Sequence, residues 1–147
     1  MQFIRPGLDE LLKCFLQLMN EIDNEDLVAA FESVVQVFSL EIKPYALDIC
    51  NHLKNMYQRC IAAGDDNGES ILAAQGTIMS IKRILDAVQE DIPLMQQVEH
   101  IIYPVLLHTL TVDGFDSIEE GMDCITFLIY YAYKQTSISA NMWKLYP

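Results

Sequence analysis

The stretch PYALDICNHLKNMYQRCI, residues 44–61, decides the fold class. Its apolar residues recur every three or four positions, which is the spacing of one face of an α-helix. Pro44 stands at the start, where a proline removes no helical hydrogen bond. The apolar positions are Ala46, Ile49, Cys50, Leu53, Met56, Tyr57, Cys60 and Ile61. The stretch therefore predicts a helix that buries one side.

The same helical spacing continues on both sides of this stretch, and no segment alternates polar and apolar residues as a strand would. Pro6 and Gly7 are expected to precede the first helix, Asn24 to cap the second, and Ser70 to cap the fourth. Asp113 and Gly114 predict a turn. The pattern predicts an all-α protein of six helices in three antiparallel pairs, followed by the start of a seventh helix.

The first helix of each pair begins near Leu8, Pro44 and Pro93, so the pairs repeat after roughly 36 and 49 residues. These spacings bracket the ~40–47 residues of HEAT or armadillo repeats. We therefore predict a fragment of a HEAT-repeat α-solenoid, with repeats at about 7–40, 44–89 and 92–135 and the start of a further repeat at 139–147. A closed six-helix bundle is the alternative that the pattern leaves open.

The chain has 147 residues and a formal net charge of −12, from nine Lys and Arg against twenty-one Asp and Glu. Apolar residues make up 52 %, enough for a sizeable core in one domain. The acidic balance disfavours binding to nucleic acid or to anionic membranes and favours a basic partner, unless it serves only to keep the surface soluble.

Features of membrane and secreted proteins are missing from the sequence. The longest apolar stretch, residues 124–133, is about half the ~20 residues of a spanning helix. The N-terminal residues carry no signal-peptide pattern. Cys50 and Cys60 fall on the apolar stripe, so we expect reduced, buried thiols. The short apolar stretch, the lack of a signal-peptide pattern and the expected reduced thiols together predict a cytosolic or nuclear protein without membrane insertion.

Enzyme signatures are also missing. The sequence holds no glycine-rich phosphate loop, no GxSxG nucleophile elbow and no HExxH zinc motif. None of the three histidines follows a glutamate by three residues, as the di-metal bundles require. We therefore predict no catalytic residue, no metal site and no cofactor, and a helical enzyme domain is the least favoured alternative.

One charge pattern rises above a generic helical fold. Acidic residues gather on the second helix of each predicted pair, and the second helices of a stacked solenoid share one surface. The candidate partner-binding residues are Glu25, Glu32, Asp86, Glu119, Glu120 and Asp123. They predict a band of carboxylates for a basic partner, with a merely solvated face as the alternative.

Several stretches resemble the importin-seven and importin-eight branch of the beta-karyopherins. They are residues 24–27 (NEDL), 41–44 (EIKP) and 46–53 (ALDICNHL), the step Gly76-Thr77-Ile78, and the closing residues 141–147 (NMWKLYP). The resemblance covers nearly the whole chain from about Leu8 on. It rests on the order and spacing of these stretches together.

This resemblance implies a middle-to-late portion of a nuclear transport receptor. Such receptors are built from HEAT repeats and carry basic cargo, such as ribosomal proteins and histones, through the nuclear pore. They shuttle between cytoplasm and nucleus, pass nucleoporins, and release cargo when the GTPase Ran binds. The resemblance places the second helix of each pair on the partner-facing side and carries over no Ran-contact residue. A HEAT scaffold or regulatory subunit of another complex is the alternative function.

Overall fold

The computed structural model describes residues 5–22, 25–39, 41–63, 68–135 and 138–145. Within these ranges the chain forms α-helices and two short 3-10 turns, Lys43–Tyr45 and Phe115–Ser117, and contains no strand. The α-helices are α1 (Arg5–Glu21), α2 (Glu25–Val37), α3 (Ala46–Ala63), α4 (Glu69–Val88), α5 (Ile92–Thr109), α6 (Ile118–Gln135) and α7 (Ala140–Lys144). The all-α prediction is confirmed.

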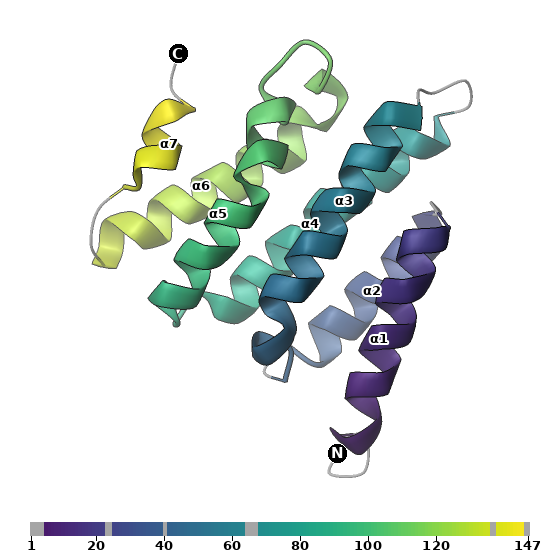
Figure 1. Cartoon of the computed structure of the whole chain (residues 1–147). Coiled ribbons are helices and arrows are strands. Elements are labelled where there is room, and N and C mark those ends of the chain that lie inside the picture. The colour runs from purple at the N-terminus through teal and green to yellow at the C-terminus, as the bar shows by residue number, and fades with distance from the viewer. Residues whose placement is uncertain (1–4, 23–24, 40, 64–67, 136–137, 146–147) are drawn as a thin grey trace.

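The helices lie in two layers. In one layer α3 packs between α1 and α5, and in the other α4 packs between α2 and α6. The helices of each successive pair run antiparallel, and the three pairs follow one another across the molecule (Figure 1). The described residues thus form a HEAT-like solenoid segment, as predicted.

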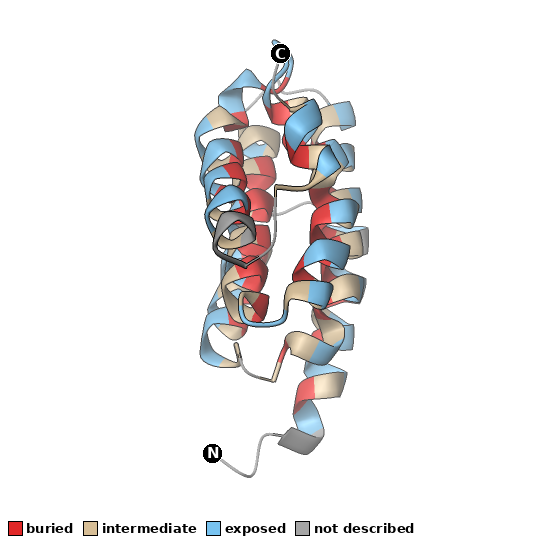
Figure 2. Ribbon diagram, turned by 90° about the vertical axis from the view of Figure 1, so that its left-hand side faces the viewer, coloured by how far each residue is buried: buried red, intermediate tan, exposed pale blue. Residues whose placement is uncertain are grey.

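The hydrophobic core lies between the two layers, and the exposed residues face outward (Figure 2). Seven of the eight apolar residues in the stretch that predicted α3 are buried, and Ile61 is half-buried. From α4 the core receives Ile78, Ile81, Ile84 and Leu85, all fully buried. The 3.6-residue periodicity therefore located the buried face correctly.

The helix starts differ from two of the predictions. Pro6 and Gly7 lie inside the first turn of α1, where the first backbone N–H groups have no helical partner and a proline is tolerated. Gly68, with φ 78°, occupies the N-cap of α4 in place of Ser70, because a glycine adopts this left-handed conformation without strain. The predicted cap Asn24 lies outside the described residues.

Two glycines allow neighbouring helices to approach closely. A Cβ atom at Gly76 of α4 would lie 3.1 Å from Cγ1 of Val28 in α2, so the two helices approach closely at this glycine. A Cβ atom at Gly121 of α6 would lie 2.2 Å from Oγ1 of Thr109, at the end of α5. Gly121 therefore sets how tightly α6 packs against α5.

Buried titratable groups lie between the helices. The hydroxyl of Tyr57 in α3 lies 3.0 Å from Nδ1 of His108 in α5. Burial raises the pKa of Tyr57 to about 12, and burial likewise raises the pKa of Cys124 to about 12. Cys50 and Cys60 are buried, reduced thiols, as expected from their place on the apolar stripe.

We expect Gly121→Ala to lower the free energy of unfolding by about 1–3 kcal/mol, because the added methyl group overlaps Thr109. Gly7→Ala is the matched control, since no atom lies within 4 Å of its Cβ position. This control gains about 0.5–1 kcal/mol from helix propensity. Urea unfolding of both variants measures the difference. Equal stability of the two variants would show that α6 has room at this position.

We also expect stability to fall at alkaline pH. The folded chain keeps protons on Tyr57 and Cys124 that the unfolded chain releases above their ordinary pKa values of 10.0 and 9.0. Their contribution is complete below pH 9 and is lost as the pH rises towards 12, by up to about 1.4 kcal/mol per pH unit for each group.

The variant Tyr57→Phe separates the contribution of Tyr57 to this pH dependence from that of Cys124. It loses about 1 kcal/mol at pH 7, with the hydrogen bond to His108. Above pH 10 its unfolding free energy falls less steeply than that of the unmodified chain. Urea titrations at several pH values measure both slopes, and identical slopes would contradict the assignment to Tyr57.

Candidate partner-binding surface

The predicted carboxylates lie on the layer formed by α2, α4 and α6. Glu32 comes from α2, Asp86 from the C-terminal half of α4, and Glu119, Glu120 and Asp123 from the first turns of α6. Residue Glu25 begins α2, but its side chain lies outside the described ones. The three helices are neighbours in space, so the expectation that second helices share one surface holds.

A cleft of about 230 Å³ brings three of these carboxylates together across α4. Glu32 contributes from the α2 side, and Glu120 and Asp123 contribute from the α6 side. The other lining residues are Met79, Lys82 and Arg83 of α4. The cleft therefore combines acidic, basic and apolar groups.

Two cations of α4 neutralise part of the predicted band. Nε of Arg83 lies 3.0 Å from a carboxylate oxygen of Glu32, and Nζ of Lys82 lies 3.0 Å from a carboxylate oxygen of Asp86. The ammonium of Lys82 also lies 4.4 Å from the ring centre of Phe127 in α6, which is a cation–π contact. Glu32 and Asp86 are thus internally paired, a feature that the charge pattern alone does not show.

The two ion pairs differ in whether the sequence indicates them. Lys82 and Asp86 are four residues apart on one helix, a spacing at which ion pairs form. Arg83 and Glu32 are 51 residues apart and meet only because α4 packs against α2. The first pair has a sequence signal, and the second has none.

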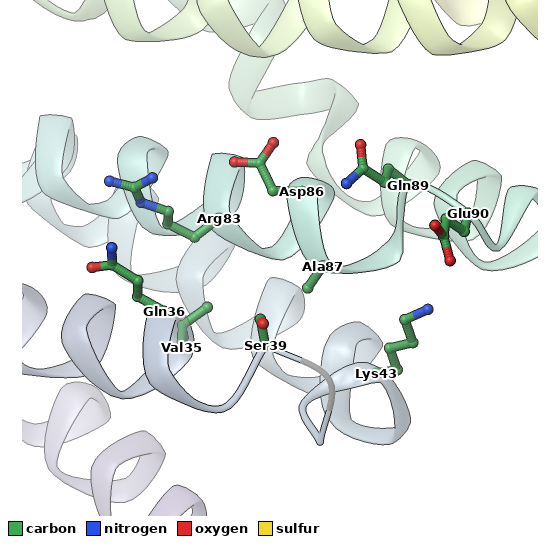
Figure 3. Close-up of a pocket in the computed structure, with 9 residues that line it drawn as sticks. All are labelled: Val35, Gln36, Ser39, Lys43, Arg83, Asp86, Ala87, Gln89 and Glu90. Atoms are coloured by element: carbon green, nitrogen blue, oxygen red, sulfur yellow. The ribbon is translucent and has the colours of Figure 1, made fainter.

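A second cleft, of about 330 Å³, lies on the other side of Arg83, between α2 and the C-terminal half of α4. Figure 3 shows Arg83 and Asp86 on α4 above the residues of α2, and Lys43 opposite Glu90. This cleft is also lined by both signs of charge. Asp86 therefore lies apart from the cleft that holds Glu32, Glu120 and Asp123.

The α6 side of the surface keeps its negative charge. Glu119 and Asp123 are exposed, and in the described part of the chain neither takes part in an ion pair. One carboxylate oxygen of Glu120 is buried without a hydrogen-bond partner. Among the predicted carboxylates of this layer, those of α6 are therefore unpaired in the described part of the chain, whereas Glu32 and Asp86 are paired.

Metal-ligand clusters and membrane-spanning helices are absent from the described residues. These residues contain no group of three or more His, Cys, Asp and Glu side chains placed to hold a metal ion. No helix among them has both the length and the apolar character needed to cross a membrane.

Known proteins resemble the chain along almost its whole length. It is 37 % identical over 148 residues to an importin beta-like SAD2 homolog of Arabidopsis thaliana, covering 98 % of this chain and 14 % of that protein. It is 34 % identical over 146 residues to a probable importin-7 homolog of Dictyostelium discoideum, covering 98 % of this chain and 13 % of that protein.

A human protein is a more distant relative. The chain is 22 % identical over 148 residues to importin-8 of Homo sapiens, covering 98 % of this chain and 14 % of that protein. No family model matches the chain, and no solved structure matches it significantly. The chain is thus homologous to one segment of the importin-7 and importin-8 group of importin beta-like proteins, a family of nuclear transport receptors.

Proposed function

We propose that this chain is a cargo-holding segment of a nuclear transport receptor, which binds basic protein cargo and carries it through the nuclear pore under the control of Ran. The observation that carries the proposal is the similarity to importin-7- and importin-8-like proteins over 98 % of the chain. In this proposal residues 7–40, 44–89 and 92–135 are three HEAT repeats, and residues 139–147 begin a fourth.

Basic cargo binds to the layer of α2, α4 and α6 in this proposal, chiefly at the N-terminal turns of α6. The carboxylates Glu119, Glu120 and Asp123 supply the attraction there, because no cation of the described chain is paired with them. Glu32 and Asp86 contribute less, since Arg83 and Lys82 already neutralise them. Electrostatic attraction of this kind mainly speeds association.

The cleft also offers an apolar contact for the same cargo. Met79 lines it and is 45 % exposed. Lysine and arginine side chains bury their aliphatic stems against apolar surface while the charged ends reach carboxylates. A methionine beside Glu120 and Asp123 therefore suits the side chains of a basic protein.

Ran and nucleoporins act on the whole receptor in this proposal, as it shuttles between cytoplasm and nucleus. A HEAT scaffold that organises another complex is the alternative function. The two differ in one measurable property, because a transport receptor releases its cargo when GTP-loaded Ran binds. A pull-down of basic cargo with the full-length receptor, with and without GTP-loaded Ran, distinguishes them.

We expect the double variant Glu119→Lys and Asp123→Lys to slow the association of a basic ribosomal protein with the full-length receptor several-fold at low salt. It should also flatten the dependence of the association rate on salt, because two attractive charges become repulsive. Both side chains are exposed, so helicity should not change. Stopped-flow mixing at several salt concentrations measures the rates.

The matched control is Glu10→Lys and Asp48→Lys on α1 and α3. It changes the net charge by the same amount, and its two carboxylates are also exposed, but they lie on the other layer. The control should bind at nearly the unmodified rate. If both double variants slow association equally, the total charge matters and the α6 surface does not.

A further inference from the structure

The connection between α5 and α6 displays large apolar side chains to solvent. Val112 is 92 % exposed and Phe115 is 64 % exposed, and Leu110 at the start of the connection is also exposed. Single exposed apolar residues are common on protein surfaces. Here three of them lie within six residues of one connection. We call this group, Leu110, Val112 and Phe115, the apolar patch.

Hydrogen bonds hold this connection firmly against the end of α5. The backbone N–H of Thr111 donates to the carbonyl of His108 at 2.9 Å, and the Thr111 hydroxyl donates to the same carbonyl at 2.7 Å. The N–H of Gly114 donates to the Thr111 hydroxyl oxygen at 3.3 Å. A Cβ atom at Gly114 would lie 2.1 Å from the His108 carbonyl oxygen, so only a glycine fits there.

Helix α4 holds the far end of the connection. The side-chain amide of Gln75 in α4 donates to the carbonyl of Asp116 at 2.6 Å. Ser117 is buried, and its backbone N–H donates to the carbonyl of Gly114 at 3.0 Å. The connection is thus tied to α4 and α5, and its exposed side chains stand on a fixed backbone.

The surroundings of the apolar patch are acidic. Asp113 and Asp116 alternate with its apolar residues, and Glu119 follows in the first turn of α6; all three are exposed. No Lys, Arg or His occurs between His108 and Lys134 in the sequence. A partner that covers the patch must therefore bring positive charge with its apolar surface.

We propose that this connection is a docking site for a basic amphipathic helix of a partner protein. The apolar stripe of such a helix covers Val112 and Phe115, whose side chains fit between its apolar residues. Its lysines and arginines flank the stripe and face Asp113, Asp116 and Glu119. The fixed backbone lowers the entropy lost on binding, which favours affinity from a small contact. The site does not depend on the proposed transport function.

The test uses the whole 147-residue chain and a synthetic peptide of about 18 residues. Leucines at helical spacing form its apolar stripe, and lysines fill the other positions. A second peptide keeps the leucines and carries glutamate in place of lysine. Fluorescence anisotropy of the labelled peptides measures the dissociation constants at low and high salt.

Phe115→Ala should weaken binding of the lysine peptide at least about tenfold, since a buried aromatic anchor dominates a small contact. Val37→Ala is the control, because Val37 is also 64 % exposed but lies on α2. The lysine peptide should bind this variant with a dissociation constant within about twofold of that for the unmodified chain. The pair Asp113→Asn and Asp116→Asn should weaken binding several-fold at low salt and hardly at all at high salt. The glutamate peptide should not bind.

Non-specific attraction to a chain of net charge −12 would give a different result. In that case Phe115→Ala and Val37→Ala would bind the lysine peptide equally well, and the proposal would be wrong. Equal binding of the glutamate peptide would also overturn it, because the acidic surroundings would then have no role. Thermal unfolding followed by circular dichroism verifies that Phe115→Ala remains folded, as expected for an exposed side chain.

Discussion

Burial of α4 is the interaction on which the rest of the structure depends. This helix packs against α3 in the other layer and against α2 and α6 in its own. Nine of its residues are buried, and Gly76 lets Val28 approach closely. Because α4 is fixed on three sides, its outward residues Lys82 and Arg83 are fixed as well. The charge pattern of the candidate surface is therefore a consequence of how the core is packed.

The sequence predicted the fold because periodic burial is a property of many residues at once. The apolar stripe of α3 remains recognisable even where one position, Ile61, is only half-buried. Helix ends depend on one or two residues and were less predictable. Gly68 takes the N-cap of α4 in place of Ser70 because its φ of 78° suits a glycine. The prediction gave more weight to the capping oxygen of Ser70 than to this preference of glycine.

The sequence predicted that the second helices share one layer, but it did not show which of their carboxylates are paired. Counting carboxylates along the chain identified the second helices, but it gave Glu32 the same weight as Glu119. The packing of α2 on α4 brings Arg83 within 3.0 Å of Glu32, a contact that depends on the tertiary fold. The exposed pair Val112 and Phe115 carried no signal either, because apolar residues in a sequence are expected to be buried unless the fold says otherwise.

The close approach of Gly121 to Thr109 links the carboxylate surface of α6 to the apolar patch. It holds the start of α6 against the end of α5, and the connection between these helices runs over the same place. Glu119 follows Ser117 by two residues and belongs to the acidic surroundings of the apolar patch and to the carboxylates of α6. A partner that engages the patch therefore also meets Glu119, the first of the α6 carboxylates. Charge brings such a partner to α6 quickly, and burial of Phe115 determines how long it stays.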